Sequence, residues 1–169
     1  MATGGLRFTR TDYVRLPEDF RVELVEGGLL KMTPPTLDHQ EAAGRIYEAL
    51  RAVARERTFM GPVGVLVDEE NVLVPDVVVL RAPPRRGARF VEDPLLVVEV
   101  LSPSTASRDR GTKTDLYLRA GAAEVWLVDL EAGSVSVRLP GAGRTVTNDA
   151  EAVSGAVPGF RLAPSRLFA

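Results

Sequence analysis

Apolar residues recur along the chain with two different periods, which predict helices and strands in turn. Between Leu37 and Arg57 the apolar positions are three and four residues apart, as on an amphipathic helix. Thr36 stands directly before this run and predicts its N-cap. A second helix is expected over Asp109–Ala120, with Gly121 ending it.

Short apolar runs rich in β-branched residues predict the strands. Three runs lie between the two helices and a fourth follows the second helix, and their near-continuous apolar character is typical of strands covered on both faces. A hairpin with a tight turn at Gly27-Gly28 is expected before the first helix. The expected strands are Arg21–Val25, Leu29–Met32, Val63–Val67, Val72–Leu80, Leu95–Leu101 and Glu124–Leu130.

The resulting order is α-β-β-β-α-β, which predicts an α/β (α+β) fold with helices flanking a mixed central sheet and an added N-terminal hairpin. The remaining residues, Ser134–Ala169, are expected to form a strand or two and a closing segment. Its expected packing residues are Phe160, Leu162, Leu167 and Phe168.

Composition narrows the class of protein. With 169 residues and 45% hydrophobic content, residues 1–169 are expected to form a single domain. No apolar run approaches the roughly 18 to 20 residues of a membrane span, and the N-terminus lacks the apolar centre of a signal peptide, so the cytoplasm is the expected compartment and no membrane partner is expected. The net charge of −2 provides no global basic field.

The absence of cysteine and the presence of one histidine limit the chemistry. Thiolate catalysis, disulfides and zinc sites built on cysteine or on several imidazoles are excluded. Any reaction must therefore depend mainly on carboxylates, Lys, Arg, hydroxyl groups or a bound ion.

Two acids stand alone within apolar strands: Asp76 in Val72–Leu80 and Glu99 in Leu95–Leu101. An ionised carboxylate in such a place requires a partner. If the strands are neighbours, two carboxylates about 4 Å apart repel by roughly 4 kcal/mol at an effective dielectric constant near 20, and a divalent ion reverses this cost. Oxygen ligands suit Mg²⁺ or Mn²⁺. The alternative is that each acid pairs with an arginine at the sheet edge.

Lys113 is predicted to face the same acids. It shares the spacing i, i+3, i+4, i+7 with Leu116, Tyr117 and Ala120, so it belongs to the helix face that packs on the sheet. A cation near a helix N-terminus is disfavoured by roughly 0.3 to 1 kcal/mol, which favours a nearby anion. The alternative is a snorkelling lysine whose stem covers apolar surface.

At these residues the chain resembles the Uma-two family of restriction-endonuclease-like proteins over roughly residues 10 to 168. Such proteins are similar to PD-(D/E)XK nucleases in fold, and the resemblance implies that Asp76 and Glu99 are metal ligands. The segments that carry it are Glu23–Gly27, Pro34-Pro35, His39-Gln40, Pro75-Asp76, Val97–Thr105, Arg108–Lys113, Tyr117 and Val125–Asp129.

One position departs from the general nuclease pattern. Two residues after Glu99, where a lysine is expected, the chain has Leu101. Lys113 on the following helix is the residue that could return the positive charge to the site. The expected fold does not depend on whether Lys113 reaches the carboxylates of Asp76 and Glu99, whereas the expected catalysis does.

The expected function is a Mg²⁺- or Mn²⁺-dependent endonuclease that hydrolyses DNA phosphodiester bonds, with Asp76, Glu99 and Lys113 as its catalytic residues. His39 and Glu23 are expected at the edge of the site, although a core or capping histidine and a solvated strand-end acid are the alternatives. A homo-oligomer is expected, since nucleases that cut both strands often pair two sites. The competing functions are a non-catalytic domain that binds nucleic acid or protein, and an enzyme acting on small phosphodiesters.

Overall fold

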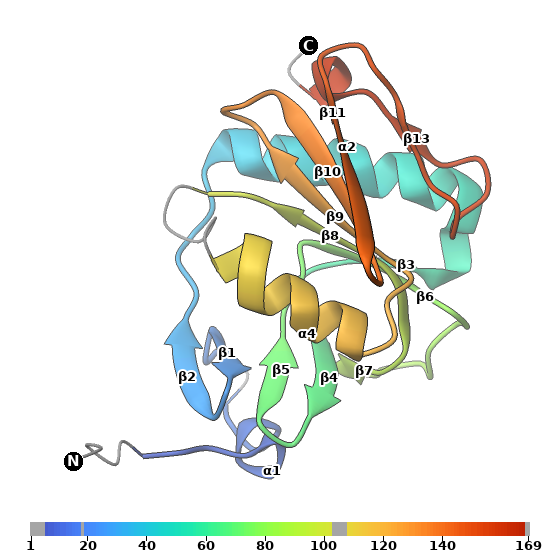
Figure 1. The fold of residues 1–169 in the computed structure, drawn as a ribbon. Coiled ribbons are helices and arrows are strands. Elements are labelled where there is room, and N and C mark those ends of the chain that lie inside the picture. The colour runs from blue at the N-terminus through green and yellow to red at the C-terminus, as the bar shows by residue number, and fades with distance from the viewer. Residues whose placement is uncertain (1–5, 18, 103–107, 168–169) are drawn as a thin grey trace.

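A computed structural model describes residues 6–17, 19–102 and 108–167 of the chain. Its main elements are two mixed sheets with helices packed against the larger one, which confirms the predicted fold class (Figure 1). The larger sheet has the strand order β11-β10-β9-β8-β6-β3, and only β8 and β9 run parallel. In that order the strands are Ala142–Thr147, Ser134–Leu139, Glu124–Asp129, Pro94–Val100, Val77–Leu80 and Thr58–Met60.

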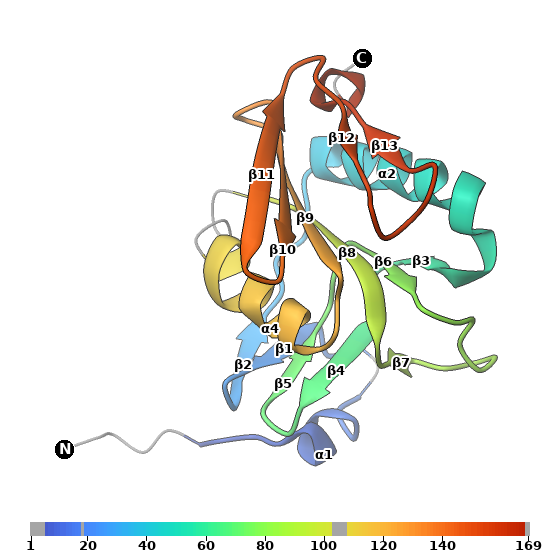
Figure 2. The same cartoon turned by 45° about the vertical axis from the view of Figure 1, so that its right-hand side comes forward.

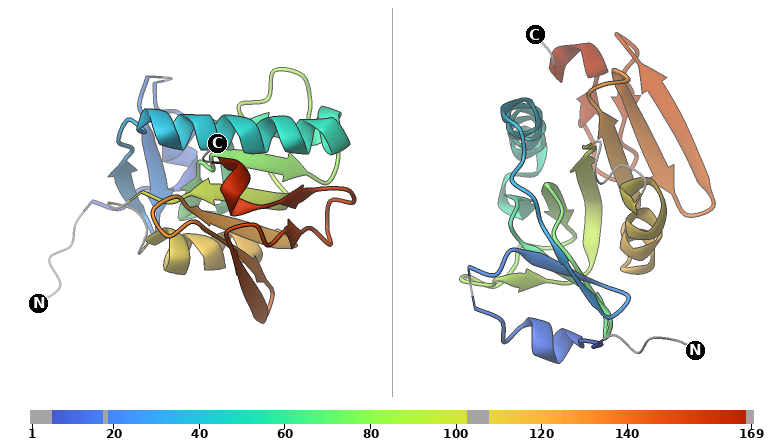
Figure 3. Two further views of the ribbon diagram at one scale, coloured as in Figure 1. Left: turned by 90° about the horizontal axis from the view of Figure 1, so that it is seen from above. Right: turned by 90° about the vertical axis from the view of Figure 1, so that its left-hand side faces the viewer.

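Helices cover both faces of this sheet, as Figure 3 shows. On one face lies α2 (Leu37–Ala54), which begins where the sequence predicts, because the hydroxyl of Thr36 accepts a hydrogen bond from the His39 N–H. The 3-10 helix η1 (Arg55–Arg57) follows α2 directly. On the opposite face lie a π-helix, η2 (Asp109–Lys113), and its continuation α4 (Thr114–Arg119).

Each helix packs on alternate residues of the strands, so the central strands are buried on both sides. Ala42, Ala43, Ile46 and Leu50 of α2 share one core with Val98 and Trp126 of the sheet. Leu116 and Tyr117 of α4 share a second core with Val97, Val125 and Leu127. This arrangement explains the nearly continuous apolar sequences, since side chains alternate between the two faces of a strand.

The smaller sheet has the order β2-β1-β5-β4-β7 and contains the predicted N-terminal hairpin. In that order the strands are Gly28–Lys31, Val22–Val25, Asn71–Leu73, Gly64–Asp68 and Phe90–Val91. A short helix, α1 (Arg10–Tyr13), packs against it: the Tyr13 hydroxyl donates to the Val22 carbonyl at 2.7 Å. The region predicted as the strand Val63–Val67 therefore lies in this sheet and not in the central one.

The predicted strand Val72–Leu80 is wrong as a single element. It is divided into β5, which ends at Leu73 in the small sheet, and β6, which begins at Val77 in the large sheet. The chain crosses between the sheets at Val74–Asp76. Pro75 has no N–H to donate to a sheet ladder, so a crossing is favoured there.

The C-terminal segment closes the core on the α2 side, as Figure 2 shows. It contains the short strands β12 (Ala152–Val153) and β13 (Arg161–Leu162) and a 3-10 helix, η3 (Pro164–Leu167). Phe160, Leu162 and Leu167 are buried as predicted, whereas Phe168 lies outside the described residues.

The buried carboxylate of Glu124 fastens this segment to the sheet. It accepts hydrogen bonds from the Trp126 indole, the Ser154 hydroxyl and the Gly155 N–H at 2.7 to 2.8 Å, and from the Ala156 N–H at 3.2 Å. Four donors thus compensate for the loss of water around this acid.

Within the part of the chain that the structure describes, no helix combines the length and the apolar character needed to cross a membrane.

Candidate active site

Glu99 is directed toward the π-helix by the alternation of strand β8. Val98 and Val100 pack in the core below α2, so Val97 and Glu99 face the opposite layer, which contains η2 and α4. The side chain of Glu99 is buried there beside Lys113.

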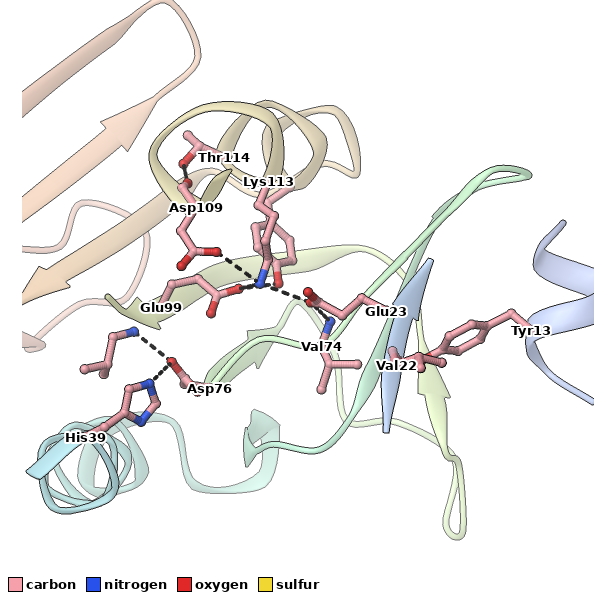
Figure 4. A network of polar contacts seen from close by, with 12 residues as sticks. Tyr13, Val22, Glu23, His39, Val74, Asp76, Glu99, Asp109, Lys113 and Thr114 are labelled. Atoms are coloured by element: carbon pink, nitrogen blue, oxygen red, sulfur yellow. Dashed lines mark hydrogen bonds and ion pairs between the residues drawn. The ribbon is translucent and has the colours of Figure 1, made fainter. Parts of the chain in front are cut away.

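Lys113 is the last residue of η2, and its ammonium group points toward the sheet (Figure 4). Its Nζ lies 2.7 Å from Oε1 of Glu99, 3.0 Å from Oε1 of Glu23 and 3.5 Å from Oδ1 of Asp109. Only 6% of the lysine side chain is exposed, so the alternative of a snorkelling lysine is excluded. The π-helix, a rare form found frequently at functional sites, carries both Asp109 and Lys113.

Two further hydrogen bonds hold the carboxylates around Lys113. The Tyr117 hydroxyl donates to Oε1 of Glu99 at 2.6 Å, one turn after Lys113 on the same helical segment. The backbone N–H of Val74 donates to Oε1 of Glu23 at 2.8 Å. The cluster therefore joins β1 of the small sheet, β8 of the large sheet and the helix that covers it.

Asp76 lies at the point where the chain enters the large sheet, next to this cluster. Its Oδ2 accepts a hydrogen bond from the Val100 N–H at 2.8 Å and lies 3.3 Å from Nε2 of His39. The Asp76 side chain is 25% exposed and the His39 side chain 15%, so this end of the site is the more open one. Figure 4 shows Asp76 and Glu99 between His39 on one side and Lys113 on the other.

The structure thus brings together the five residues that the sequence singled out. In the described residues, neither acid has the arginine partner that was the alternative: Glu99 pairs with Lys113, and Asp76 with His39. The His39 N–H is capped by Thr36 while its ring contacts Asp76, so this residue lines the site and also takes part in the helix cap. Glu23 is buried and not solvated.

Sequence reasoning did not assign roles to Asp109 and Tyr117. Both stand four positions from Lys113, one before and one after, and such spacing places side chains on one face of a helix. The signal was present in the sequence, because the helical spacing already predicted that Lys113 faces the sheet.

The charges of the cluster shift its proton affinities. Burial raises the pKa of Glu99 to about 8; Lys113 opposes this, while Asp76, Asp109 and Glu23 add to it. Burial lowers the pKa of Lys113, but the attraction of Glu99, Glu23 and Asp109 outweighs it and raises that pKa above its ordinary value. Lys113 is therefore an ammonium ion at neutral pH.

The groups that flank the acids are shifted as well. Burial lowers the pKa of His39, but the hydrogen bond and charge of Asp76 outweigh burial and raise it. Burial, together with the charges of Glu99 and Glu23, raises the pKa of Tyr117 well above its ordinary value, so the phenol stays protonated and acts as a donor.

The oxygen donors of Asp76 and Glu99 are of the kind that hard divalent cations prefer. Among the described residues, no group of three or more histidine or acidic side chains could hold a metal ion by itself. Mg²⁺, however, is commonly bound by one or two carboxylates together with water and substrate phosphates. Asp76 and Glu99 supply two carboxylates, each with one oxygen fixed by protein donors, in a cluster whose four acids exceed its cations.

Comparison with known proteins shows similarity along nearly the whole chain. A model of the Uma2 family, described as "Putative restriction endonuclease", matches residues 10–165. The fold resembles that of a protein from Anabaena variabilis described as "a putative nuclease belonging to DUF820", with a TM-score of 0.81 over 95% of this chain and 97% of that chain. The two are 24% identical in sequence, so this likeness concerns the fold alone.

A shorter match links the chain to an uncharacterized protein of Synechocystis sp., with 49% identity over 53 residues. The match spans 31% of this chain and only 28% of the length of that relative.

Proposed function

The chain belongs to the Uma2 family, and from this premise we propose that it is a divalent-metal-dependent nuclease that hydrolyses DNA phosphodiester bonds. The observation that carries the proposal is the 2.7 Å contact between Lys113 and Glu99, with Asp76 beside them. These three residues place a lysine and two acids at one site, although Leu101 stands where the general nuclease pattern has its lysine. The family description supports DNA as the substrate, because restriction endonucleases cleave DNA.

Asp76 and Glu99 are the residues that would hold the metal. A bound Mg²⁺ or Mn²⁺ would supply Lewis-acid polarisation of a phosphodiester oxygen and lower the pKa of water at the site. The two acids need not be rearranged for this role, because Val100 and His39 already orient Asp76, and Tyr117 orients Glu99.

Lys113 acts as a fixed positive charge. Because its pKa is raised, the ammonium form persists at neutral pH, which suits stabilisation of the negative charge that develops on the phosphate and orientation of the attacking water. The same raised pKa argues against Lys113 as the general base. It can donate a proton from Nζ, whereas accepting one would require it first to lose its charge among three acids.

The test is cleavage of supercoiled plasmid with Mg²⁺ or Mn²⁺, beside an EDTA control. The variants are Asp76→Asn, Glu99→Gln and Lys113→Met, with Lys31→Met as the matched control, since Lys31 is the other lysine of the chain and is exposed. We expect metal-dependent nicking that each of the first three variants reduces by about 100-fold or more, and that Lys31→Met leaves unchanged.

Calorimetric titration with Mn²⁺ separates catalysis from binding. Binding that is lost in Asp76→Asn, without cleavage of duplex or single strands, would point to a target that the plasmid lacks. The absence of any Mn²⁺ binding by the wild-type protein would refute the metal-dependent mechanism and favour a domain that only binds nucleic acid or protein.

A further inference from the structure

Glu23 contributes to the cluster from a different sheet. It lies on β1 of the small sheet, yet its Oε1 is 3.0 Å from Nζ of Lys113. The same oxygen accepts the Val74 N–H, a donor fixed in the backbone segment that leads to Asp76. Glu23 is therefore a buried carboxylate with a defined position, and not a mobile surface acid.

The position of Glu23 suits it for holding the lysine rather than a metal. Its Oε1 contacts both the Val74 N–H and Lys113, and Figure 4 shows it on the side of Lys113 opposite Glu99. Glu99, in contrast, is the acid that a metal would share. A divalent cation bound to Glu99 would neutralise part of the charge of this carboxylate. Glu99 would then attract the ammonium group of Lys113 less strongly. A second acid that keeps its charge is then needed to keep the ammonium group in place.

Asp109 is less suited to this task. Its Oδ1 lies 3.5 Å from Nζ, beyond the usual length of a charge-assisted hydrogen bond. It also stands on the same π-helix as Lys113, so it moves with the lysine. Glu23 fixes the lysine relative to the sheets, which Asp109 cannot do.

We propose that Glu23 is a positioning residue that holds the Lys113 ammonium group in the site when Glu99 is engaged by the metal. The proposal rests on the nuclease function proposed above, but its structural part can be measured without catalysis. Glu23 touches neither the metal nor the reacting atoms, and it acts only through Lys113.

The chain contains only two lysines, Lys31 and Lys113, which makes the ammonium group directly observable. In protein labelled with ¹⁵N at lysine Nζ, the buried Lys113 should give a slowly exchanging ammonium signal, whereas the exposed Lys31 exchanges rapidly with water. We expect Glu23→Gln, which keeps an acceptor for Val74, to speed Lys113 hydrogen exchange by about 10-fold or more, since it replaces a charge-assisted bond with a weaker one.

Glu26→Gln is the matched control, because it removes one acidic charge from the exposed turn of the same hairpin. It should leave the Lys113 signal as in the wild type. The spectra are recorded with and without Mg²⁺, which is diamagnetic and is therefore used in place of Mn²⁺. Circular dichroism checks that each variant is folded. An unchanged Lys113 exchange rate in folded Glu23→Gln, with Mg²⁺ present, would overturn the proposal.

Steady-state kinetics then tests the link to the reaction. We expect Glu23→Gln to lower kcat by about 10-fold and to leave KM for DNA nearly unchanged, because Lys113 acts on charge that develops in the transition state. Faster Lys113 exchange in Glu23→Gln, together with a wild type that neither binds Mn²⁺ nor cleaves DNA, would keep the contact between Glu23 and Lys113 and reject the nuclease. Active wild type with an unchanged kcat in Glu23→Gln would keep the nuclease and reject the positioning role.

Discussion

The ammonium nitrogen of Lys113 lies 2.7 Å from Oε1 of Glu99, although the two residues belong to different layers of the fold. Glu99 stands within a buried strand, and Lys113 ends the π-helix that covers it. Because Glu23 and Asp109 also surround the ammonium group, one lysine compensates three buried acids. Both the stability and the proton affinity of the site therefore depend on this pair.

Lys113→Met should destabilise the metal-free protein by about 3 to 5 kcal/mol at pH 8, since it leaves buried acids without their cation. The loss should be smaller at pH 5, where Glu99, whose pKa is raised by burial, is protonated. Urea denaturation at the two pH values measures both effects, with Lys31→Met as the surface control. A loss of less than about 1 kcal/mol at pH 8 would show that the cluster does not depend on the lysine.

Metal affinity should rise with pH up to about 8. The pKa of Glu99 is raised to about 8, mainly by burial, so below that pH a proton competes with the metal for this carboxylate. We expect Mn²⁺ affinity, measured by calorimetry, to increase by nearly 10-fold between pH 6 and pH 7 and to level off above pH 8. A flat profile from pH 6 to 8 would mean that Glu99 is already ionised in the metal-free protein.

His39→Ala should weaken Mn²⁺ binding by about 10- to 100-fold, because Asp76 loses a partner that orients Oδ2. Gln40→Ala, an exposed change at the next position of the same helix, is the control. Calorimetric titration gives both affinities. Equal affinities of the two variants would assign His39 to the helix cap alone.

Glu124→Ala should destabilise the fold by about 3 kcal/mol, since four donors of the sheet and the C-terminal segment lose their acceptor. Metal affinity should stay within about twofold of the wild type, because Glu124 takes no part in the candidate site. Urea denaturation and Mn²⁺ titration test the two statements, with exposed Glu131→Ala as control. A stability equal to that of the control would contradict this role of Glu124.

Sequence periodicity was sufficient for the two main helices and for the inward direction of Lys113, because helical spacing is a local property of the chain. It also located Asp76 and Glu99 as acids in apolar surroundings. It was not sufficient for the division of Val72–Leu80 between two sheets. Apolar runs look alike wherever they are buried, and only Pro75 marked the crossing.

The sequence placed Glu23 at the edge of the candidate site, but it could not predict that Glu23 contacts Lys113. Glu23 and Lys113 are distant in sequence, and their 3.0 Å contact arises because the small sheet packs beside the helix that covers the large sheet. Such a contact depends on tertiary structure, which no local pattern encodes. Tyr117, in contrast, could have been assigned from its spacing to Lys113 alone.

The segment Val74–Asp76, where the chain crosses from the small sheet to the large one, is also part of the candidate site. Three consecutive residues provide the donor for Glu23, the change of sheet and the carboxylate of Asp76. A displacement of the small sheet relative to the large sheet would therefore move this segment. A ligand that shifts one sheet relative to the other would change the distance between Glu23, on the small sheet, and Asp76, at the entry to the large sheet.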